Sequence, residues 1–148
     1  MIFVTVGTTP FDALIEEMDI LAPELKDKVV CQIASGTYIP KNCGYFRMEP
    51  DISDRLKKAD VVVTHGGAAT IFEAMAMGKK VIAVCNPDMK EKHQEDLVKH
   101  LAAKGCILEG GMGILKKALR SRKKPRPLSP AEFDIGAVQE LLSSPRSP

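Results

Sequence analysis

Hydrophobic and polar residues alternate in blocks along the chain, and these blocks predict short strands separated by helices. Strands are expected where β-branched, aromatic or other apolar residues cluster, at residues 2–6, 29–34, 45–48, 61–64, 81–85 and 106–108. Helices are expected where apolar residues recur every three or four positions, at residues 11–21, 53–59, 69–77, 93–104 and 114–119. Such alternation is typical of βαβ units, so we expect an α/β, Rossmann-like three-layer domain with a mainly parallel sheet.

Local signals mark several ends of these helices. The Thr-Pro pair at residues 9–10 fits the N-cap and the first position of the first helix. Gly78 and Gly105 lie just past their helices, where glycine is favoured because it adopts left-handed backbone angles. Gly78 is therefore interpreted as a helix cap and not as part of a phosphate loop, and the lysines after it, at positions 79 and 80, as solvated side chains.

The stretch from residue 60 to residue 73 is a strand, a glycine turn and the start of a helix. Gly66 and Gly67 permit a sharp turn and close approach of a ligand because they carry no Cβ. The helix that follows would offer free N–H groups and the positive end of its dipole, which suit phosphate. The same residues also fit an ordinary strand-to-helix turn, and the sequence leaves both interpretations open.

Three such loops are expected at one edge of the sheet because each follows the carboxyl end of a parallel strand. These loops begin at Gly7, at His65 and at Asn86. In open parallel sheets, ligands bind in the crevice at that edge. The sequence therefore predicts a single site formed by the three loops, although we assign no catalytic role to His65.

Glu73 and Gln94 are the polar side chains near these loops with the most suggestive chemistry. Glu73 lies one helical turn beyond the glycine turn, where a carboxylate could accept hydrogen bonds from both hydroxyls of a ribose. An exposed helix glutamate is the common alternative, but the neighbouring residues are apolar, and a buried Glu73 would need a partner. Gln94 carries a donor and an acceptor together, which suits paired sugar hydroxyls.

The residue patterns typical of metal binding and of nucleophilic catalysis are absent from the sequence. The three histidines do not have the spacing of a metal site, and no Asp-x-Asp motif is present to hold a divalent metal on a sugar diphosphate. Neither a Ser/His/Asp nor a Cys/His arrangement is readable, and the missing nucleophile elbow disfavours a small hydrolase-like domain. We therefore expect no metal and no resident cofactor.

The composition indicates the number of domains and the cellular compartment. The 148 residues fit one domain, with 45% hydrophobic and 27% charged residues, and the net charge of +2 does not favour general nucleic-acid binding. The four cysteines form no CxxC pair, and Cys31, Cys85 and Cys106 lie in or beside apolar runs, so we expect these three to be reduced core residues of a cytoplasmic protein. No run resembles a signal peptide or a membrane span.

The composition changes after residue 120. Residues 116–126 hold seven lysines and arginines, and a Ser-Pro-Ala-Glu start at residues 129–132 predicts a short helix with a docking face near Leu141. We therefore divide the chain into a ligand-binding domain, residues 1–120, and a basic linker with a C-terminal helix, residues 121–148. The basic segment could face anionic lipid or an acidic partner, or it could simply be solvated.

Four motifs together resemble the C-terminal, donor-binding domain of the family 28 glycosyltransferases. They are IFVTVGTTPFD (residues 2–12), ADVVVTHGGAAT followed by EA (59–70 and 73–74), GKKVIAV (78–84) and HQEDL (93–97). The resemblance covers roughly residues 1–119. It is greatest to the small soluble catalytic subunits of two-chain transferases, of the dolichol-linked UDP-N-acetylglucosamine type and of the bacterial exopolysaccharide type.

The resemblance implies half of a GT-B enzyme, binding a UDP-sugar donor without an obligatory metal. By family position, the diphosphate would be bound by Gly7, Thr8, Gly67, Ala68, Ala69 and Thr70. Glu73 would bind the ribose, His93 and Gln94 would face the sugar, and residues 47–51 would border the base. The sequence departs from many relatives at CNPDMK (residues 85–90), which leaves the identity of the sugar open.

A whole GT-B enzyme has two Rossmann-like halves, and this chain has the length of one. The resemblance therefore implies a membrane-anchored acceptor-domain partner, to which the chain would attach peripherally. The expected reaction transfers N-acetylglucosamine or glucuronic acid from a UDP-sugar to a polyprenyl-diphosphate-linked saccharide. The alternative is a non-catalytic nucleotide-binding regulatory module, and without its partner the chain could form a homodimer.

Overall fold

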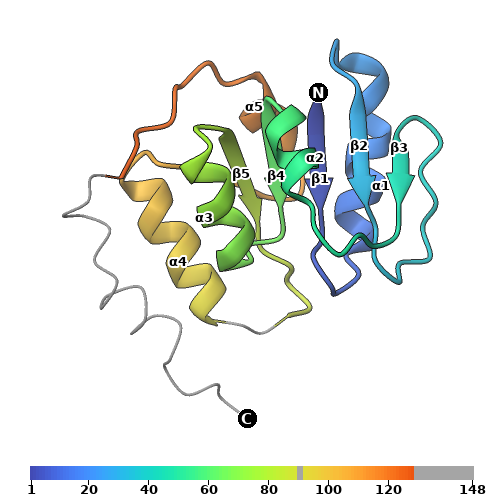
Figure 1. Ribbon diagram of the computed structural model, residues 1–148, viewed down its shortest axis with the longest axis horizontal. Coiled ribbons are helices and arrows are strands. Elements are labelled where there is room, and N and C mark those ends of the chain that lie inside the picture. Colours follow the sequence, from blue (N-terminus) through green and yellow to red (C-terminus); the bar gives the residue numbers. More distant parts are fainter. Residues whose placement is uncertain (90–91, 129–148) are drawn as a thin grey trace.

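The structure is a computed structural model that describes residues 1–89 and 92–128. Six parallel strands form one sheet in the order β3-β2-β1-β4-β5-β6 (Figure 1). The strands are β1 (Ile2–Thr5), β2 (Val29–Gln32), β3 (Gly44–Phe46), β4 (Val61–Thr64), β5 (Lys80–Val84) and β6 (Leu108–Gly110). The helices are α1 (Asp12–Leu21), the short 3₁₀ helix η1 (Ala22–Glu24), α2 (Ser53–Lys58), α3 (Ala68–Ala76), α4 (Lys92–Ala103) and α5 (Leu115–Arg120).

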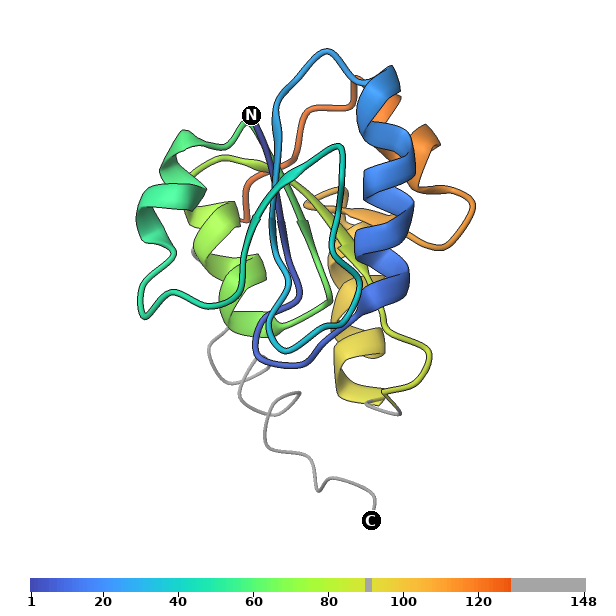
Figure 2. The ribbon, with the colours of Figure 1, turned by 90° about the vertical axis from the view of Figure 1, so that its right-hand side faces the viewer.

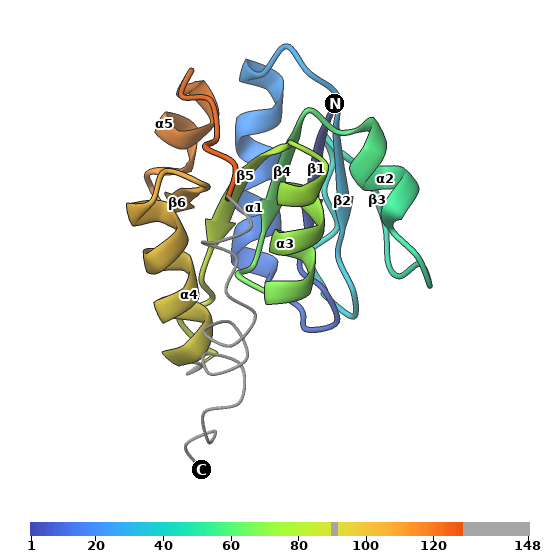
Figure 3. The same cartoon turned by 60° about the vertical axis from the view of Figure 1, so that its left-hand side comes forward.

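Helices cover both faces of the sheet, which makes the predicted three layers. Successive strand residues point to opposite faces, so Phe3 packs among α2, α3 and α4 whereas its neighbour Val4 packs against α1 and α5. Figures 2 and 3 show the sheet between α1 on one side and α3 on the other. Strands covered on both faces need apolar side chains at every position, which is why residues 61–63 form a continuous valine run.

The structure corrects three local predictions, beginning with the start of α1. The helix begins at Asp12 and not at Pro10, because the amides of Leu14 and Ile15 both donate to the carbonyl of Phe11. Phe11 is the N-cap residue and makes no side-chain capping bond. The predicted capping role of the Thr-Pro pair is therefore wrong.

The last strand is displaced from its predicted position, residues 106–108, to Leu108–Gly110. Cys106 is apolar and buried, but its amide donates to the carbonyl of Leu101 at 3.0 Å, so its backbone still closes α4. The glycine caps themselves are confirmed: Gly78 and Gly105 have φ of +72° and +75°.

Lys80 was predicted to be solvated, and this is wrong. Its ammonium donates to the carbonyls of Leu119 at 3.0 Å and Ser121 at 2.7 Å, which attaches the segment after α5 to the start of β5. Residues 121–128 that follow contain neither helix nor strand. The helix predicted from Ser129 lies outside the described residues, and the division of the chain at residue 120 stays a prediction.

Candidate functional site

The strand order places a crevice at the centre of the sheet. The chain passes from the edge strand β3 across to β4, so β1 and β4 are neighbours whose connections leave in opposite directions. Such a switch point is where open parallel sheets bind ligands. The loops after β1, β4 and β5, which the sequence predicted to meet, lie side by side along the carboxyl ends of these adjacent strands.

The imidazole of His65 lies between the first two of these loops. A Cβ added to Gly7 or to Gly67 would come within 2.7 Å of the ring, closer than real side chains pack. Gly7 also has φ of +67°, an angle that residues with a side chain rarely adopt. Both glycines are therefore needed for the ring to occupy this half-buried position, and sequence reasoning missed that role of His65.

Buried polar groups fix the turn at Gly7. The Gly7 amide donates to the hydroxyl of Thr5 at 3.2 Å, and this hydroxyl lies 2.5 Å from the side-chain oxygen of Gln32. Thr5 and Gln32 are both 3% exposed or less. Thr8, in contrast, is exposed to solvent. Buried side chains thus fix the backbone of this loop at Gly7, while Thr8 remains exposed.

The amino end of α3 opens into the same crevice. Gly67 is its N-cap, with extended angles and no side-chain capping bond. The first helical acceptor is the Gly67 carbonyl, which receives the amide of Ile71 at 3.1 Å. The amides of Ala68, Ala69 and Thr70 precede that bond, and in the described part of the chain none of them has an acceptor. Three donors and the positive end of the helix dipole therefore point out of α3.

Glu73 lies one turn further along α3 and is half-buried. The partner that the sequence required is Ser53, whose hydroxyl lies 2.9 Å from Oε1 of Glu73. The same hydroxyl lies 2.6 Å from Oδ1 of Asp51, which also accepts the Ser53 amide at 2.9 Å. The hydrogen bonds from Ser53 lower the pKa of Asp51. This contact ties α3 to the segment predicted to border a base, residues 47–51.

The loop after β2 completes the far side of the crevice. One nitrogen of the Arg47 guanidinium donates to the carbonyls of Ala34 at 3.1 Å and Gly36 at 2.9 Å. Ala34 has φ of +53°, an uncommon angle for a residue with a side chain, so this loop is strained. The sequence offered no signal for it, because the bonds join residues from two different strand ends.

Two carboxylates on α1 hold the rest of that loop. Oδ2 of Asp12 accepts the amide and the hydroxyl of Thr37, at 3.1 and 2.8 Å. Asp19 is buried and accepts the Tyr38 hydroxyl at 2.7 Å and the amides of residues 41 and 42 at 3.0 and 2.6 Å. Asp12 acts at the end of α1 nearest the crevice, and Asp19 acts two turns away.

Gln94 reaches the crevice from α4. Its Oε1 lies 3.7 Å from the position of a Cβ on Gly66, so it is next to the glycine turn. Gln94 also lines a cavity of about 590 Å³ together with Cys85, Asn86, Pro87, Met89, Lys92 and Glu95. His93 is half-buried in the first turn of α4 and does not line that cavity. Only one of the two predicted sugar-facing residues is thus placed at it.

Other features of the described residues limit the chemistry. All four cysteines are free, and of the three predicted to be reduced core residues, Cys31 and Cys106 are buried whereas Cys85 is half-buried. Within residues 1–89 and 92–128, no group of three or more histidine, cysteine, aspartate or glutamate residues could hold a metal ion. In the same part of the chain, every helix is too short or too polar to cross a membrane.

Comparison with known proteins identifies the family. Residues 1–121 match the model of the glycosyltransferase family 28 C-terminal domain. The human UDP-N-acetylglucosamine transferase subunit ALG13 is 32% identical over 121 residues, which are 72% of this chain and 10% of that protein. The Desulforamulus reducens UDP-N-acetylglucosamine--N-acetylmuramyl-(pentapeptide) pyrophosphoryl-undecaprenol N-acetylglucosamine transferase is 27% identical over 127 residues, which are 80% of this chain and 33% of that protein.

A solved structure shows the same fold at lower identity. The crystal structure of Acinetobacter baumannii MurG superposes with a TM-score of 0.65 at 19% identity, over 93% of this chain and 44% of that one. The predicted fold, that of the C-terminal half of a GT-B glycosyltransferase, is confirmed. The chain belongs to the family defined by the glycosyltransferase family 28 C-terminal domain.

Proposed function

We propose that this chain is the donor-binding catalytic subunit of a two-component glycosyltransferase. It would move N-acetylglucosamine or glucuronic acid from a UDP-sugar to a polyprenyl-diphosphate-linked saccharide. The observation that carries the proposal is the convergence of the Gly7 and Gly67 turns on His65 at the amino end of α3, with Glu73 one turn beyond. The human and Desulforamulus reducens relatives are named as transferases of UDP-N-acetylglucosamine, and the name of the second includes a pyrophosphoryl-undecaprenol acceptor, which supports the proposed donor and acceptor.

In this proposal the diphosphate lies on Gly67 and the first turn of α3. The amides of Ala68, Ala69 and Thr70 have no acceptor in the described chain and would donate to the phosphate oxygens, and the Thr70 hydroxyl would add one more donor. Gly7 and Thr8 would line the opposite side. Negative charge grows on UDP as the sugar leaves, and donors already held in place by the helix would stabilise it.

The proposed positions of the ribose, the base and the sugar follow from that of the diphosphate. Glu73 would accept the ribose hydroxyls through the oxygen that Ser53 does not contact, and residues 47–51 would border the base. The cavity beside Gln94 would take the sugar. His93 does not line this cavity, so its predicted contact with the sugar would require the donor to extend beyond it. N–H and O–H groups of the protein would thus stabilise the negative charge of the diphosphate. We assign no resident cofactor and no obligatory metal.

The acceptor half would come from a second chain. The human relative is named as a subunit of a transferase, and the sheet described in this chain is one Rossmann-like half. We propose a membrane-anchored acceptor-domain subunit that presents the lipid-linked acceptor and supplies the general base. The chain would then be cytoplasmic and attached to the membrane through that partner, without nucleic acid. Self-association through the uncovered crevice would be the result without the partner.

Glu73 provides the first test. In the full chain, Glu73→Gln should weaken UDP binding about tenfold, as expected for losing a hydrogen bond to a charged group. Glu16→Gln removes the same charge from the exposed side of α1 and should leave affinity unchanged. Calorimetry with UDP, with thermal unfolding of each variant, makes the measurement. A wild-type chain that ignores UDP and UDP-sugars even with its partner would contradict the proposal.

Transfer itself separates a subunit of an enzyme from a regulatory module. The chain should be expressed with a membrane-anchored acceptor-domain protein and supplied with a radiolabelled UDP-sugar and a lipid-linked acceptor. A catalytic subunit gives labelled lipid that depends on Glu73. A regulatory module would bind UDP equally well and give no labelled lipid with any partner.

A further inference from the structure

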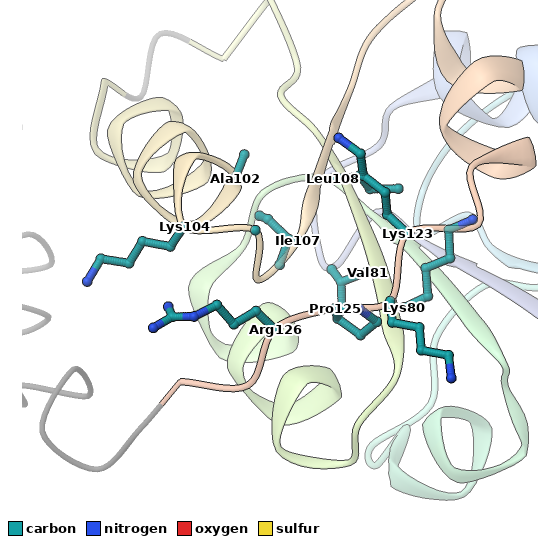
Figure 4. Close-up of a pocket in the computed structure, with 11 residues that line it drawn as sticks. Lys80, Val81, Ala102, Lys104, Ile107, Leu108, Lys123, Pro125 and Arg126 are labelled. Atoms are coloured by element: carbon teal, nitrogen blue, oxygen red, sulfur yellow. The ribbon is translucent and has the colours of Figure 1, made fainter.

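A second cavity lies at the opposite edge of the sheet, around the start of β5. Its volume is about 320 Å³, and it is bordered by α4, the start of β6 and the segment after α5. Its basic residues are Lys80, Lys104, Lys123, Lys124 and Arg126. Figure 4 shows Lys104 and Arg126 on one side of the cavity and Lys80 and Lys123 on the other. None of the described residues that line it is acidic.

The segment that carries most of these charges is fixed at both ends. Lys80 holds the start of it by donating to the carbonyls of Leu119 and Ser121. The backbone amide of Arg126 holds the other end by donating to the carbonyl of Gly105 at 2.9 Å. Burial lowers the pKa of Lys80, in keeping with this structural role. The lysines between the two attachments are therefore presented to the cavity by a positioned backbone and not by a loose tail.

The other lysines have no local counter-charge. Within the described part of the chain, Lys104, Lys123 and Lys124 form no ion pair. The C-terminal end of α4 is nearby, and its carbonyls at residues 100, 101 and 102 already accept the amides of Lys104, Cys106 and Gly105. The cavity thus brings together three lysines that no carboxylate of residues 1–89 and 92–128 pairs with.

The interior of the cavity is apolar. Val81, Ile107 and Pro125 line it, and the first two are buried, with 1% and 3% of their surfaces exposed. A site with cationic walls and an apolar floor suits a compact anion attached to a carbon skeleton. Carboxylates would also be attracted, but a phosphate monoester carries nearly two negative charges and three acceptor oxygens, which matches several lysines at once.

We propose that this cavity binds a phosphate monoester at a site separate from the crevice. Lys104, Lys123 and Lys124 would contact the phosphate, while Lys80 and the backbone of Arg126 keep the segment in place. The two sites lie at opposite ends of the strands, since Lys80 is the first residue of β5 and the crevice lies beyond its last residue, Val84. The phosphate could belong to a soluble metabolite or to a lipid headgroup, and the two sources require separate measurements.

Amide chemical shifts of the full chain can locate the binding. Titration with glycerol 3-phosphate should shift the amides of Gly105, Ile107 and Lys124. Lys123→Gln combined with Lys124→Gln should weaken binding by roughly 25-fold, from about fivefold for each cation near an anionic group. Lys26→Gln combined with Lys28→Gln removes the same charge from exposed positions before β2 and should change little. UDP titrated into the same samples reports independently on the crevice.

Sedimentation with phosphatidylcholine vesicles, with and without phosphatidic acid, distinguishes the sources. Binding that needs phosphatidic acid and is lost in the Lys123/Lys124 variant assigns a lipid headgroup. Binding of glycerol 3-phosphate without vesicle binding assigns a soluble phosphate. The proposal would be overturned if glycerol 3-phosphate shifted no amide of residues 104–108 and phosphatidic acid did not increase sedimentation with vesicles. Equal losses in the Lys26/Lys28 variant would also overturn it, because they would show attraction to overall charge alone.

Discussion

At the carboxyl end of the sheet, positive potential comes from backbone amides presented by glycine turns, whereas at the amino end it comes from lysine and arginine side chains. The amides of the first turn of α3 cannot move without unwinding the helix, so their geometry is fixed. The side chains of Lys123 and Lys124 are exposed, and lysine carries its charge on a flexible four-carbon stem. Small changes of shape should therefore damage the crevice, whereas the basic cavity should respond to the number of charges.

The strongest test of this difference is a single added methyl group. Gly67→Ala keeps an allowed backbone, with φ of −67°, but places Cβ 2.7 Å from the His65 ring. Overpacking of this kind costs about 1–3 kcal/mol, so UDP affinity should fall roughly tenfold to hundredfold. Gly111→Ala is the matched control, because its Cβ would meet Ile114 at an ordinary 3.5 Å.

The Gly67→Ala result can be checked by making room for the methyl group. Calorimetry with UDP on Gly67→Ala, on His65→Ala and on the double variant measures how the two changes interact. If crowding is the cause, the double variant binds no worse than His65→Ala alone. Wild-type affinity in Gly67→Ala would mean that shape at the crevice matters as little as at the basic cavity.

A second test asks whether α1 supports the fold independently of the crevice. Burial raises the pKa of Asp19, but hydrogen bonds from Lys41, Tyr38 and Asn42 outweigh it and lower the pKa overall. The stability that this carboxylate contributes is thus complete above its unfolded pKa of about 3.9 and is lost as the pH falls through the lower folded value.

Asp19→Asn should therefore lower the free energy of unfolding by about 2 kcal/mol at neutral pH, and by less in acid. UDP affinity of the folded protein should stay unchanged. Urea denaturation at neutral pH and in acid measures the free energy of unfolding, with Asp27→Asn as an exposed control. A loss that is equal at both pH values would show that the charge of Asp19 is not what stabilises the loop.

The smallest expected effect concerns the hydroxyl beside Glu73. Ser53→Ala removes the contact to Glu73 at 2.9 Å, so ordering the carboxylate on a ligand should cost more and weaken UDP binding about threefold. Ser121→Ala removes a hydroxyl near the basic cavity, where it accepts the Lys123 amide, and should leave UDP binding unchanged. Calorimetry compares the two, and equal effects would remove the distinction between the ends of the sheet.

The sequence predicted the crevice better than it predicted the individual side chains. Strand and helix order follow from local patterns of apolar residues, and that order alone brings the Gly7 and Gly67 turns to adjacent strand ends. The place of His65 depends on contact between those two turns, which no local pattern reports. The Ser53 partner of Glu73 could be anticipated only as a requirement, since it comes from a different helix.

The predictions failed at residues whose side-chain character does not indicate the hydrogen bonds that they form. Cys106 and Ile107 are as apolar as strand residues, yet the ladder with β5 starts at Leu108, paired with Ile82. Lys80 looks like a solvated residue in a charged pair, but carbonyls 39 and 41 positions later in the chain accept hydrogen bonds from it. Both errors arise because hydrogen bonds between distant segments decide the outcome.

The two outer strands of the sheet, β3 and β6, are only three residues long. Unpaired edges of longer strands act as templates on which another chain can extend the sheet, which leads to aggregation. Edges this short offer few main-chain groups for such growth. A second polypeptide, whether a different subunit or another copy, would therefore have to attach through loops and side chains and not by strand addition.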